Sequence, residues 1–470
     1  MSVILRRSDS EREMLLAGIK NKGKQMKTII MAGGKGTRIS SIASDIPKPM
    51  IRMNGKPVLE HEIECLRDQG FTDIILTVSH LAEYIMDYFG DGSGVSPSTG
   101  QPFGVHITYY VEEQPLGNAG AVFKLWKSGM LDEDFMLLIA DAMFHIDFNR
   151  FVRFHFEHHA LATLFTHPNS HPYDSGLVIA DESSHIVTDW LNKEDERPAF
   201  YKNRVNAGLH ILSPAILKRS AIEPDMVGAL RRVDLDRDVL KPQIASGAIC
   251  AYDSPEYVKD MGTPERFYQV TADVKSGLVA ARNLKNPQKA IFLDRDGTIN
   301  PYVGFLTKTE QFELGEGVAG AVKRINASGY LCIVITNQPV IARGEVTEAE
   351  LEVIHNKMET LLGNEGAYVD AIYYCPHHPD RGFEGERSEL KIDCECRKPK
   401  PGLLLRAAKD FHIDLEKSWM IGDGERDVKA GINAKCRTIL LRGGESGEMD
   451  FGQDRTAGSL AEAVDYVLHL

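Results

Sequence analysis

The sequence predicts an α/β protein with two domains, and three observations support this prediction. At 470 residues the chain is too long for one core, because a domain usually holds about 100–200 residues. Short β-rich runs alternate with stretches of helical spacing, which is typical of a parallel sheet covered by helices. The alternation begins at Lys27 and begins again at Lys289. We therefore expect one domain over residues 26–284 and a second over residues 289–470, divided near residue 286.

The spacing of apolar residues predicts the individual elements. In the first domain we expect, in order, a buried strand over 28–31, a helix over 58–66 and a strand over 73–78. The same order in the second domain predicts a strand over 290–293, a helix over 318–325 and a strand over 331–335.

Composition and charge exclude several classes of protein. The net charge of −13 argues against a nucleic-acid partner, since phosphate backbones attract clustered Lys and Arg. The longest apolar runs are far shorter than the roughly 18 residues of a membrane span, so no membrane partner is expected. An odd number of cysteines, seven, does not fit a disulfide framework and favours the cytoplasm. Residues 1–25 are polar and of mixed charge, and we interpret them as an N-terminal appendage.

The first predicted strand runs into a glycine-rich loop, Met31-Ala32-Gly33-Gly34-Lys35-Gly36-Thr37-Arg38. Glycines let backbone N–H groups approach a phosphate closely, and a cationic side chain neutralises its charge. Such loops also occur for steric reasons alone, and this spacing matches neither the dinucleotide fingerprint nor the Walker loop. Lys48 and Lys56 follow shortly after, and they favour a phosphate site.

With these residues, the stretch from about Met26 to Gly277 resembles the sugar-1-phosphate nucleotidyltransferase family. Further matching stretches are 116–120, 206–208 and 260–265, together with Asp141. The resemblance implies a Rossmann-like domain that binds a nucleoside triphosphate and a sugar phosphate. The residues it implies, by role, are Gly33, Gly34, Gly36, Thr37, Arg38, Lys48 and Gly117 for the nucleotide, Arg38 and Lys48 for catalysis, Asp141 and Asp260 for Mg²⁺, and Lys193 and Asn206 for the sugar phosphate.

Nucleotidyl transfer needs such a set of residues. The sugar phosphate oxygen attacks the α-phosphorus of the triphosphate and expels pyrophosphate, so positioning and charge neutralisation carry most of the catalysis. Two carboxylates with a metal and two cations meet that need. Taken singly, Asp141 is more readily a helix cap or turn residue and Lys48 a solvated surface lysine, and it is the joint pattern that favours function.

The strand predicted over 290–293 ends in Asp294-Arg295-Asp296-Gly297-Thr298. Two carboxylates two residues apart at the end of a buried strand repel each other unless a cation compensates them, so a metal site is expected. This stretch resembles the signature of the haloacid dehalogenase superfamily. The later motifs of that superfamily follow in order, up to about Gly443, as Thr336-Asn337-Gln338, Arg397-Lys398-Pro399 and Gly422-Asp423.

That resemblance implies a Rossmannoid phosphatase domain that hydrolyses phosphomonoesters. Asp294 is expected to attack phosphorus and form an aspartyl phosphate, and Asp296 to act as general acid and then general base. Mg²⁺ is expected on Asp294, on the backbone carbonyl of Asp296 and on Asp423, with Asp427 close by. The residues implied for the phosphoryl group and the sugar phosphate are Thr336, Asn337, Arg343, Arg397 and Lys398.

Three cysteines lie close together in the sequence with histidines, as Cys375-Pro376-His377-His378 and Cys394-Glu395-Cys396. A Cys₃His set suits tetrahedral Zn²⁺, and four protein ligands make the site structural. A redox pair of Cys394 and Cys396 is the alternative, although one intervening residue strains a disulfide. The cluster is similar to the zinc loop of the heptose bisphosphate and histidinol phosphatases, which implies His377 rather than His378 as the ligand.

Together the two resemblances imply a bifunctional enzyme of nucleotide-activated heptose biosynthesis, supplying lipopolysaccharide or capsule. The phosphatase would remove the 7-phosphate of D-glycero-D-manno-heptose 1,7-bisphosphate, and the transferase would couple heptose 1-phosphate to a nucleotide, GTP being favoured. Two alternatives stay open: the same reactions on another sugar phosphate such as mannose 1-phosphate, or a regulatory first domain, as in translation initiation factor subunits of similar fold. Nucleotide choice and oligomeric state, a homo-oligomer included, are also open.

Overall fold

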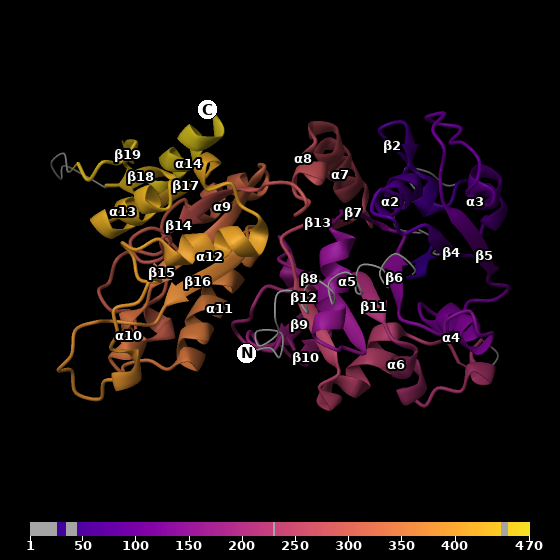
Figure 1. Cartoon of the computed structure of the whole chain (residues 1–470), viewed down its shortest axis with the longest axis horizontal. Helices are drawn as coiled ribbons and strands as arrows, with labels where there is room; N and C mark the ends of the chain where they lie inside the picture. The colour runs from indigo at the N-terminus through magenta and orange to yellow at the C-terminus, as the bar shows by residue number, and fades with distance from the viewer. Residues whose placement is uncertain (1–25, 34–44, 229–230, 443–449) are drawn as a thin grey trace, which may run out of the picture. The chain divides into compact units, whose positions relative to one another are not determined.

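The computed structural model describes residues 26–33, 45–228, 231–442 and 450–470, and its α/β elements form two compact units (Figure 1). Within the described ranges, the first unit comprises the residues up to Thr166, Val178–Trp190 and Asn206–Asn283. The second comprises His167–Leu177, Leu191–Val205 and Leu284–Leu470. The expected appendage over 1–25 lies outside the described residues. In the ranges given above, no helix is both long enough and apolar enough to span a bilayer.

A nine-stranded sheet with the path β10-β9-β11-β6-β1-β4-β5 is the centre of the first unit, and β8 pairs with β11 and β12. Strands β1, β4, β5 and β6 are parallel, whereas β11 runs antiparallel to β6. The strand bounds are β1 Thr28–Met31, β4 Asp73–Val78, β5 His106–Val111, β6 Phe135–Ile139, β8 Ala162–His167, β9 Leu177–Ala180, β10 Val187–Leu191, β11 Val205–Leu212 and β12 Ile249–Asp253.

Two small sheets, β2 with β3 and β7 with β13, complete the strands of this unit. Their bounds are β2 Arg52–Met53, β3 Lys56–Pro57, β7 Ala142–His145 and β13 Tyr257–Asp260. The helices are α2 Val58–Arg67, α3 Ala82–Phe89, α4 Gly120–Lys127, α5 Phe148–Glu157, α6 Pro214–Arg219, α7 Pro264–Ser276 and α8 Leu278–Ala281.

Both faces of the large sheet are buried. Ile30 packs into one hydrophobic cluster and its neighbour Ile29 into the other, because successive strand residues point to opposite faces. A strand covered on both sides reads as a continuous apolar run, which is why Thr28–Met31 shows no alternation of polar and apolar residues. The strands predicted over 28–31 and 73–78 and the helix predicted over 58–66 are confirmed by β1, β4 and α2.

The second unit is built on a six-stranded parallel sheet of order β16-β15-β14-β17-β18-β19. The strands are β14 Lys289–Leu293, β15 Tyr330–Asn337, β16 Ala371–Cys375, β17 Trp419–Gly422, β18 Arg437–Leu441 and β19 Arg455–Ala457. The helices are α9 Val318–Asn326, α10 Pro339–Ala342, α11 Glu348–Asn364, α12 Gly402–Phe411, α13 Glu425–Asn433 and α14 Leu460–Leu468.

Helices cover both faces of this sheet as well. Ile291 and Leu293 pack with residues of α9, α11 and α14, whereas Ala290 and Phe292 pack with residues of α12 and α13. This two-sided burial explains the apolar run that ends at Asp294. The predicted strands over 290–293 and 331–335 and the predicted helix over 318–325 are confirmed by β14, β15 and α9.

One titratable group in the core of the first unit makes its stability depend on pH. His210 lies on β11 with 2% of its surface exposed, and burial lowers its pKa to about 4. The folded state therefore keeps the ring neutral, whereas in the unfolded chain the ring takes up a proton below a pKa of about 6.5. Stability falls as the pH falls through this window, and we expect a loss of about 2 kcal/mol between pH 7 and pH 5.

The measurement is urea unfolding of a Trp419→Phe background, in which the fluorescence comes from Trp126 and Trp190, both of the first unit. His210→Leu in that background should lose about 2 kcal/mol less than its parent between the two pH values. Equal losses in both proteins would show that His210 does not titrate in this way.

Candidate functional sites

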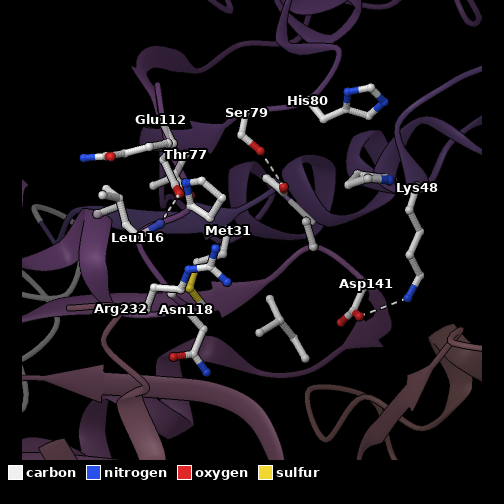
Figure 2. A pocket seen from close by; sticks show the side chains of 18 of the residues that line it. Met31, Lys48, Thr77, Ser79, His80, Glu112, Leu116, Asn118, Asp141 and Arg232 are labelled. Carbon is white, nitrogen blue, oxygen red and sulfur yellow. Dashed lines mark hydrogen bonds and ion pairs between the residues drawn. The ribbon is translucent and has the colours of Figure 1, made fainter. Parts of the chain in front are cut away.

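A cavity of about 890 Å³ opens at the carboxyl ends of β1, β4 and β6 (Figure 2). Parallel strands end at the same edge of a sheet, so residues distant in sequence meet there. Met31 and Gly33 line the cavity from the end of β1, Thr77 and Ser79 from β4, and Asp141 from β6. Backbone and polar side chains thus converge on one concave space, which is the usual form of a ligand site.

The Lys48 ammonium points at the Asp141 carboxylate, at 2.9 Å from Oδ2 (Figure 2). The lysine side chain is 10% exposed and the aspartate 45%, so the charged pair faces the cavity. Strand β7 pairs with β13 so that Ala142 lies opposite Asp260. This pairing brings Asp141 and Asp260, far apart in the sequence, to one place. Asp260 already accepts hydrogen bonds from the Gly262 N–H and from Arg266.

Glu62 is a carboxylate beneath this pair that the sequence analysis missed. It lies on α2, fully buried, where burial first and the negative charge of Asp141 second raise its pKa well above the usual value. Its position one helical turn after Val58 and one before Leu66 places it on the apolar face of α2. The sequence pattern that could have indicated Glu62 is a glutamate among the apolar residues of one helix face.

The loop 112–118 forms the opposite end of the cavity in the view of Figure 2. Gly117 has φ +86°, and a Cβ there would lie 2.3 Å from the Val233 carbonyl oxygen, so only glycine fits. The Val233 N–H in turn donates to Leu116 O at 2.9 Å. Glu112 accepts a hydrogen bond from the Leu116 N–H, and burial raises the pKa of its carboxyl group.

The remaining predicted transferase residues differ in whether the structure describes them and in the unit to which they belong. Gly34, Gly36, Thr37 and Arg38 lie outside the described residues, whereas the Gly33 carbonyl accepts a hydrogen bond from Ser79 at 2.6 Å. Asn206 begins the last segment of the first unit, and its Oδ1 accepts the Gly208 N–H. Lys193 is exposed, follows β10 and belongs to the second unit, so its predicted role stays a prediction.

In the second unit the predicted phosphatase residues meet at the carboxyl edge of the sheet. β14 lies between β15 and β17, which brings Asp294, Thr336 and Asp423 to the same edge. Oxygen atoms of Asp294, Asp423 and Asp427 all lie within 4.8 Å of one another. Gly297, at φ +85°, leaves room for this cluster, because a Cβ there would be 2.1 Å from Asp423 Oδ2.

This carboxylate cluster fits a divalent cation. Within the described ranges, the buried Asp423 Oδ1 has no hydrogen-bond partner, and an unpaired buried carboxylate oxygen is costly unless a cation binds it. Asp294 and Asp423 are two of the predicted ligands. The side chain of Asp296 is bound by Arg295 and Gln338, and its backbone carbonyl stays a predicted ligand.

The Lys398 side chain contacts two of the three carboxylates of this cluster. Its fully buried ammonium lies 2.8 Å from Asp294 Oδ1, 2.6 Å from Asp427 Oδ1 and 2.8 Å from the Ile335 carbonyl. Burial first and the Asp427 charge second raise the pKa of Asp294 to about 6, against the opposing effect of Lys398. Both ends of the Asn337 amide hold the Lys398 backbone, at 3.0 Å each.

Asp296 is fixed by a network that the sequence analysis did not foresee. The buried Arg295 guanidinium donates to both carboxylate oxygens of Asp296, at 2.9 and 2.8 Å. Gln338 adds a hydrogen bond of 3.0 Å to Asp296 and one of 2.8 Å to Thr336 Oγ1. His355 of α11 accepts from Arg295 at 3.2 Å, since burial holds its pKa well below the usual value and keeps the ring neutral.

The two predicted arginines lie nearer the surface of this unit. The Arg343 guanidinium is stacked between the rings of Phe305 and Phe383, at 4.3 and 4.4 Å from their centres. Its Nε also donates to Glu345. Arg397 is half-buried and donates from Nη1 to the His377 carbonyl at 3.1 Å.

The predicted Cys₃His set is assembled in space. Ligand atoms of Cys375, His377, Cys394 and Cys396 lie within 4.8 Å of one another. The Cys396 sulfur is 3.1 Å from Cys394 and 3.3 Å from both Cys375 and His377 Nδ1. His378 instead accepts the Asp380 N–H. Hydrogen bonding with Cys375 first, and also with Cys394, lowers the pKa of the Cys396 thiol to about 5 against the opposing effect of burial, and a thiolate is the form that binds a metal.

Comparison with known proteins identifies both parts. The nucleotidyl transferase family matches residues 27–277, and the HAD-hydrolase-like family matches residues 395–468. The chain belongs to the nucleotidyl transferase family. Over 176 residues, 37% of this chain and 90% of the relative, it is 41% identical to the D-glycero-beta-D-manno-heptose-1,7-bisphosphate 7-phosphatase of Escherichia coli. The phosphatase of the same name from Pasteurella multocida is 43% identical over 159 residues, 34% of this chain and 84% of the relative.

Two crystal structures resemble the chain in part. HddC from Yersinia pseudotuberculosis is 26% identical and covers 53% of this chain and 99% of its own, with a TM-score of 0.43. A D,D-heptose 1.7-bisphosphate phosphatase from B. bronchiseptica, complexed with magnesium and phosphate, is 32% identical and covers 39% of this chain and 99% of its own, with a TM-score of 0.34.

This member of the nucleotidyl transferase family is therefore a bifunctional enzyme. Its first part is a nucleotidyltransferase, and its second part, related to the named phosphatases, is a phosphatase of the HAD superfamily. Both kinds of enzyme generally use Mg²⁺, and the carboxylates described above supply its preferred oxygen ligands.

Proposed function

We propose that the two activities are consecutive steps in making a nucleotide-activated heptose. The observation that carries this proposal is the 41% identity of the second part to a D-glycero-beta-D-manno-heptose-1,7-bisphosphate 7-phosphatase, on a chain that also holds a nucleotidyltransferase. Removal of the 7-phosphate leaves heptose 1-phosphate, and a sugar 1-phosphate is the substrate of such a transferase. One chain then yields NDP-heptose for a surface polysaccharide.

In the proposed phosphatase reaction, Asp294 attacks the 7-phosphate and displaces the sugar alkoxide, which takes a proton from Asp296. Water then attacks the aspartyl phosphate while Asp296 accepts its proton. Asp294, Asp423 and the Asp296 carbonyl would hold Mg²⁺, which supplies charge neutralisation. Arg295 and Gln338 keep the Asp296 carboxyl group in position through both steps, and Thr336 points its hydroxyl at the phosphoryl group.

In the proposed transferase reaction, the cavity at the end of β1, β4 and β6 holds the triphosphate. Gly33 and the rest of the glycine-rich loop, with Gly34, Gly36, Thr37 and Arg38, bind the phosphates, and Lys48 neutralises charge at the α-phosphate. Asp141 and Asp260 would hold Mg²⁺ beside it. Lys193 and Asn206 bind the sugar phosphate, whose oxygen attacks phosphorus.

GTP is the proposed nucleotide. Glu112 lines the end of the cavity away from Lys48, on the loop that precedes Gly117. A carboxylate accepts hydrogen bonds only, and the Watson–Crick edge of guanine offers two adjacent N–H donors, whereas the corresponding positions of adenine offer none. The charge of Glu112 therefore favours guanine over adenine.

We further propose that the four-ligand site of Cys375, His377, Cys394 and Cys396 binds structural Zn²⁺, which pins the loop between the two cysteine pairs. We propose the division between domains near residue 286, with an appendage over 1–25 and catalytic domains over 26–284 and 289–470. Reduced cysteines that can bind zinc favour the cytoplasm. Arg343 and Arg397 remain the proposed ligands of the sugar phosphate.

The central experiment supplies the protein with the heptose bisphosphate, Mg²⁺ and each nucleoside triphosphate in turn. We expect release of one phosphate first, followed by formation of NDP-heptose and pyrophosphate. The order follows because the product of the phosphatase, heptose 1-phosphate, is the substrate of the transferase. Asp294→Asn should stop phosphate release and leave transfer to supplied heptose 1-phosphate, while Asp141→Asn should do the reverse. Phosphate and product are measured by mass spectrometry.

Three results would contradict this assignment. If neither product forms, the proposed pathway is wrong. Faster turnover of mannose 1-phosphate than of heptose 1-phosphate would favour the other sugar. Transfer that persists in Asp141→Asn would favour a regulatory first domain.

Base selection is tested by Glu112→Gln. We expect KM for GTP to rise about 10- to 100-fold, the effect of a lost charge-assisted hydrogen bond, with little change for ATP. Glu113→Gln is the matched control, since Glu113 also lines the cavity and is exposed. An equal rise for GTP and ATP would show that Glu112 does not read the base.

The zinc site is tested by metal analysis of the purified protein. We expect one zinc per chain, and its loss in Cys394→Ser should lower the melting temperature of the second unit, because metal binding contributes folding energy. Cys436→Ala removes a buried cysteine of the same unit outside the cluster and should keep the zinc. A metal-free protein with a Cys394–Cys396 disulfide would support the redox pair instead.

A further inference from the structure

The phosphoryl group that Asp294 accepts needs hydrogen-bond donors as well as positive charge. Lys398 has three N–H groups, and three oxygens lie at 2.6 to 2.8 Å from its nitrogen: Asp294 Oδ1, Asp427 Oδ1 and the Ile335 carbonyl. The ammonium is therefore already surrounded by oxygens of the protein, with the Ile335 carbonyl as hydrogen-bond acceptor and the two carboxylates as ion-pair partners. The ammonium lends charge to the reaction and the Thr336 hydroxyl offers one donor, so the other phosphoryl oxygens have room for a further donor side chain.

Arg426 is placed to supply them. It lies in the first turn of α13, and its Nη2 is 4.0 Å from Asp294 Oδ2, the carboxylate oxygen that Lys398 does not contact. The side chain is 45% exposed, so its planar fork remains accessible to a ligand. Despite partial burial, the charges of Asp294, Asp427 and Asp423 raise the pKa of Arg426 and keep it ionised.

Arg426 also acts electrostatically on a second guanidinium, that of Arg397. Burial first, and the charge of Arg426 among the other causes, lower the pKa of Arg397. Two guanidiniums that repel each other are stabilised when an anion binds to both. Tyr302, from the loop after β14, also acts electrostatically on Arg426.

We propose that Arg426 binds the transferred phosphoryl group and donates hydrogen bonds to its oxygens. As the bond from Asp294 Oδ2 to phosphorus forms and the bond from phosphorus to the sugar oxygen breaks, Asp296 gives its proton to that oxygen. Arg426 keeps its hydrogen bonds to the phosphoryl oxygens during this displacement and during hydrolysis of the aspartyl phosphate. The inference rests on the proposed aspartyl-phosphate mechanism, and it does not depend on which sugar carries the phosphate.

The test compares Arg426→Gln and Arg426→Lys in the full chain. Two substrates are used, the heptose 1,7-bisphosphate and p-nitrophenyl phosphate, which carries no second phosphate. We expect Arg426→Gln to lower kcat/KM about 10- to 100-fold on both substrates, and to weaken inhibition by inorganic phosphate by a similar factor. Arg426→Lys should recover part of the loss, because it restores charge without the fork.

Lys429→Gln is the matched control. Lys429 lies on the same helix, is half exposed and pairs with Glu425 rather than with the aspartates, so its removal should leave both activities within twofold. Nucleotidyl transfer by the same chain, together with the melting temperature, reports whether each variant is folded.

The outcomes separate this inference from the proposed substrate. A loss confined to the bisphosphate would show that Arg426 binds the distal phosphate, and unchanged kinetics would show that it binds neither; both overturn the inference. If the unmodified protein hydrolyses p-nitrophenyl phosphate and not the bisphosphate, the proposed substrate is wrong. The p-nitrophenyl phosphate series then still decides the role of Arg426.

Discussion

The phosphatase site depends on one buried contact, the Lys398 ammonium held between Asp294 and Asp427. Two carboxylates this close and this buried repel each other, and removing one partner from such a cluster typically costs about 3–5 kcal/mol. The contact joins the end of β14, the segment before α12 and the first turn of α13. Gly422 makes it possible, because a Cβ there would lie 2.4 to 2.6 Å from atoms of the Asp427 side chain. The arrangement of the other residues of the phosphatase site depends on this contact of Lys398 with the two aspartates.

The transferase site also pairs a cation with a carboxylate, but this pair is less buried than the one in the phosphatase site. Its cation–carboxylate pair, Lys48 with Asp141, faces the cavity, so both charges can change partners when a triphosphate and a metal arrive. The buried carboxyl group of Glu62 lies near the pair, and burial first and the charge of Asp141 second raise its pKa. A pair that faces a cavity suits a site that exchanges two large anionic substrates, whereas a fully buried pair suits a nucleophile that must not move.

The sequence predicted the strands that end in functional residues because their motifs are local. Asp294 and Asp296 stand directly after an apolar run, and Cys375, His377, Cys394 and Cys396 are conspicuous by type and spacing. Arg295, Gln338 and His355 were missed because their roles arise from contacts between β14, the segment after β15 and α11. No local pattern reports such contacts. That Asn337 binds the sugar phosphate was predicted from its motif and stays a prediction. Both ends of its amide also hold the Lys398 backbone, and only the folded chain shows that pairing.

A protein with a net charge of −13 that acts on phosphates must place its cations individually. Arg295 is bound to Asp296 and Lys398 to Asp294 and Asp427, so the carboxylates that perform the chemistry also fix the cations beside them. Such pairs are oriented before substrate arrives, and little reorganisation is left for the transition state. The same arrangement surrounds those cations with acceptors of the protein itself. In the proposed mechanism Arg426 then adds a donor for the group that moves.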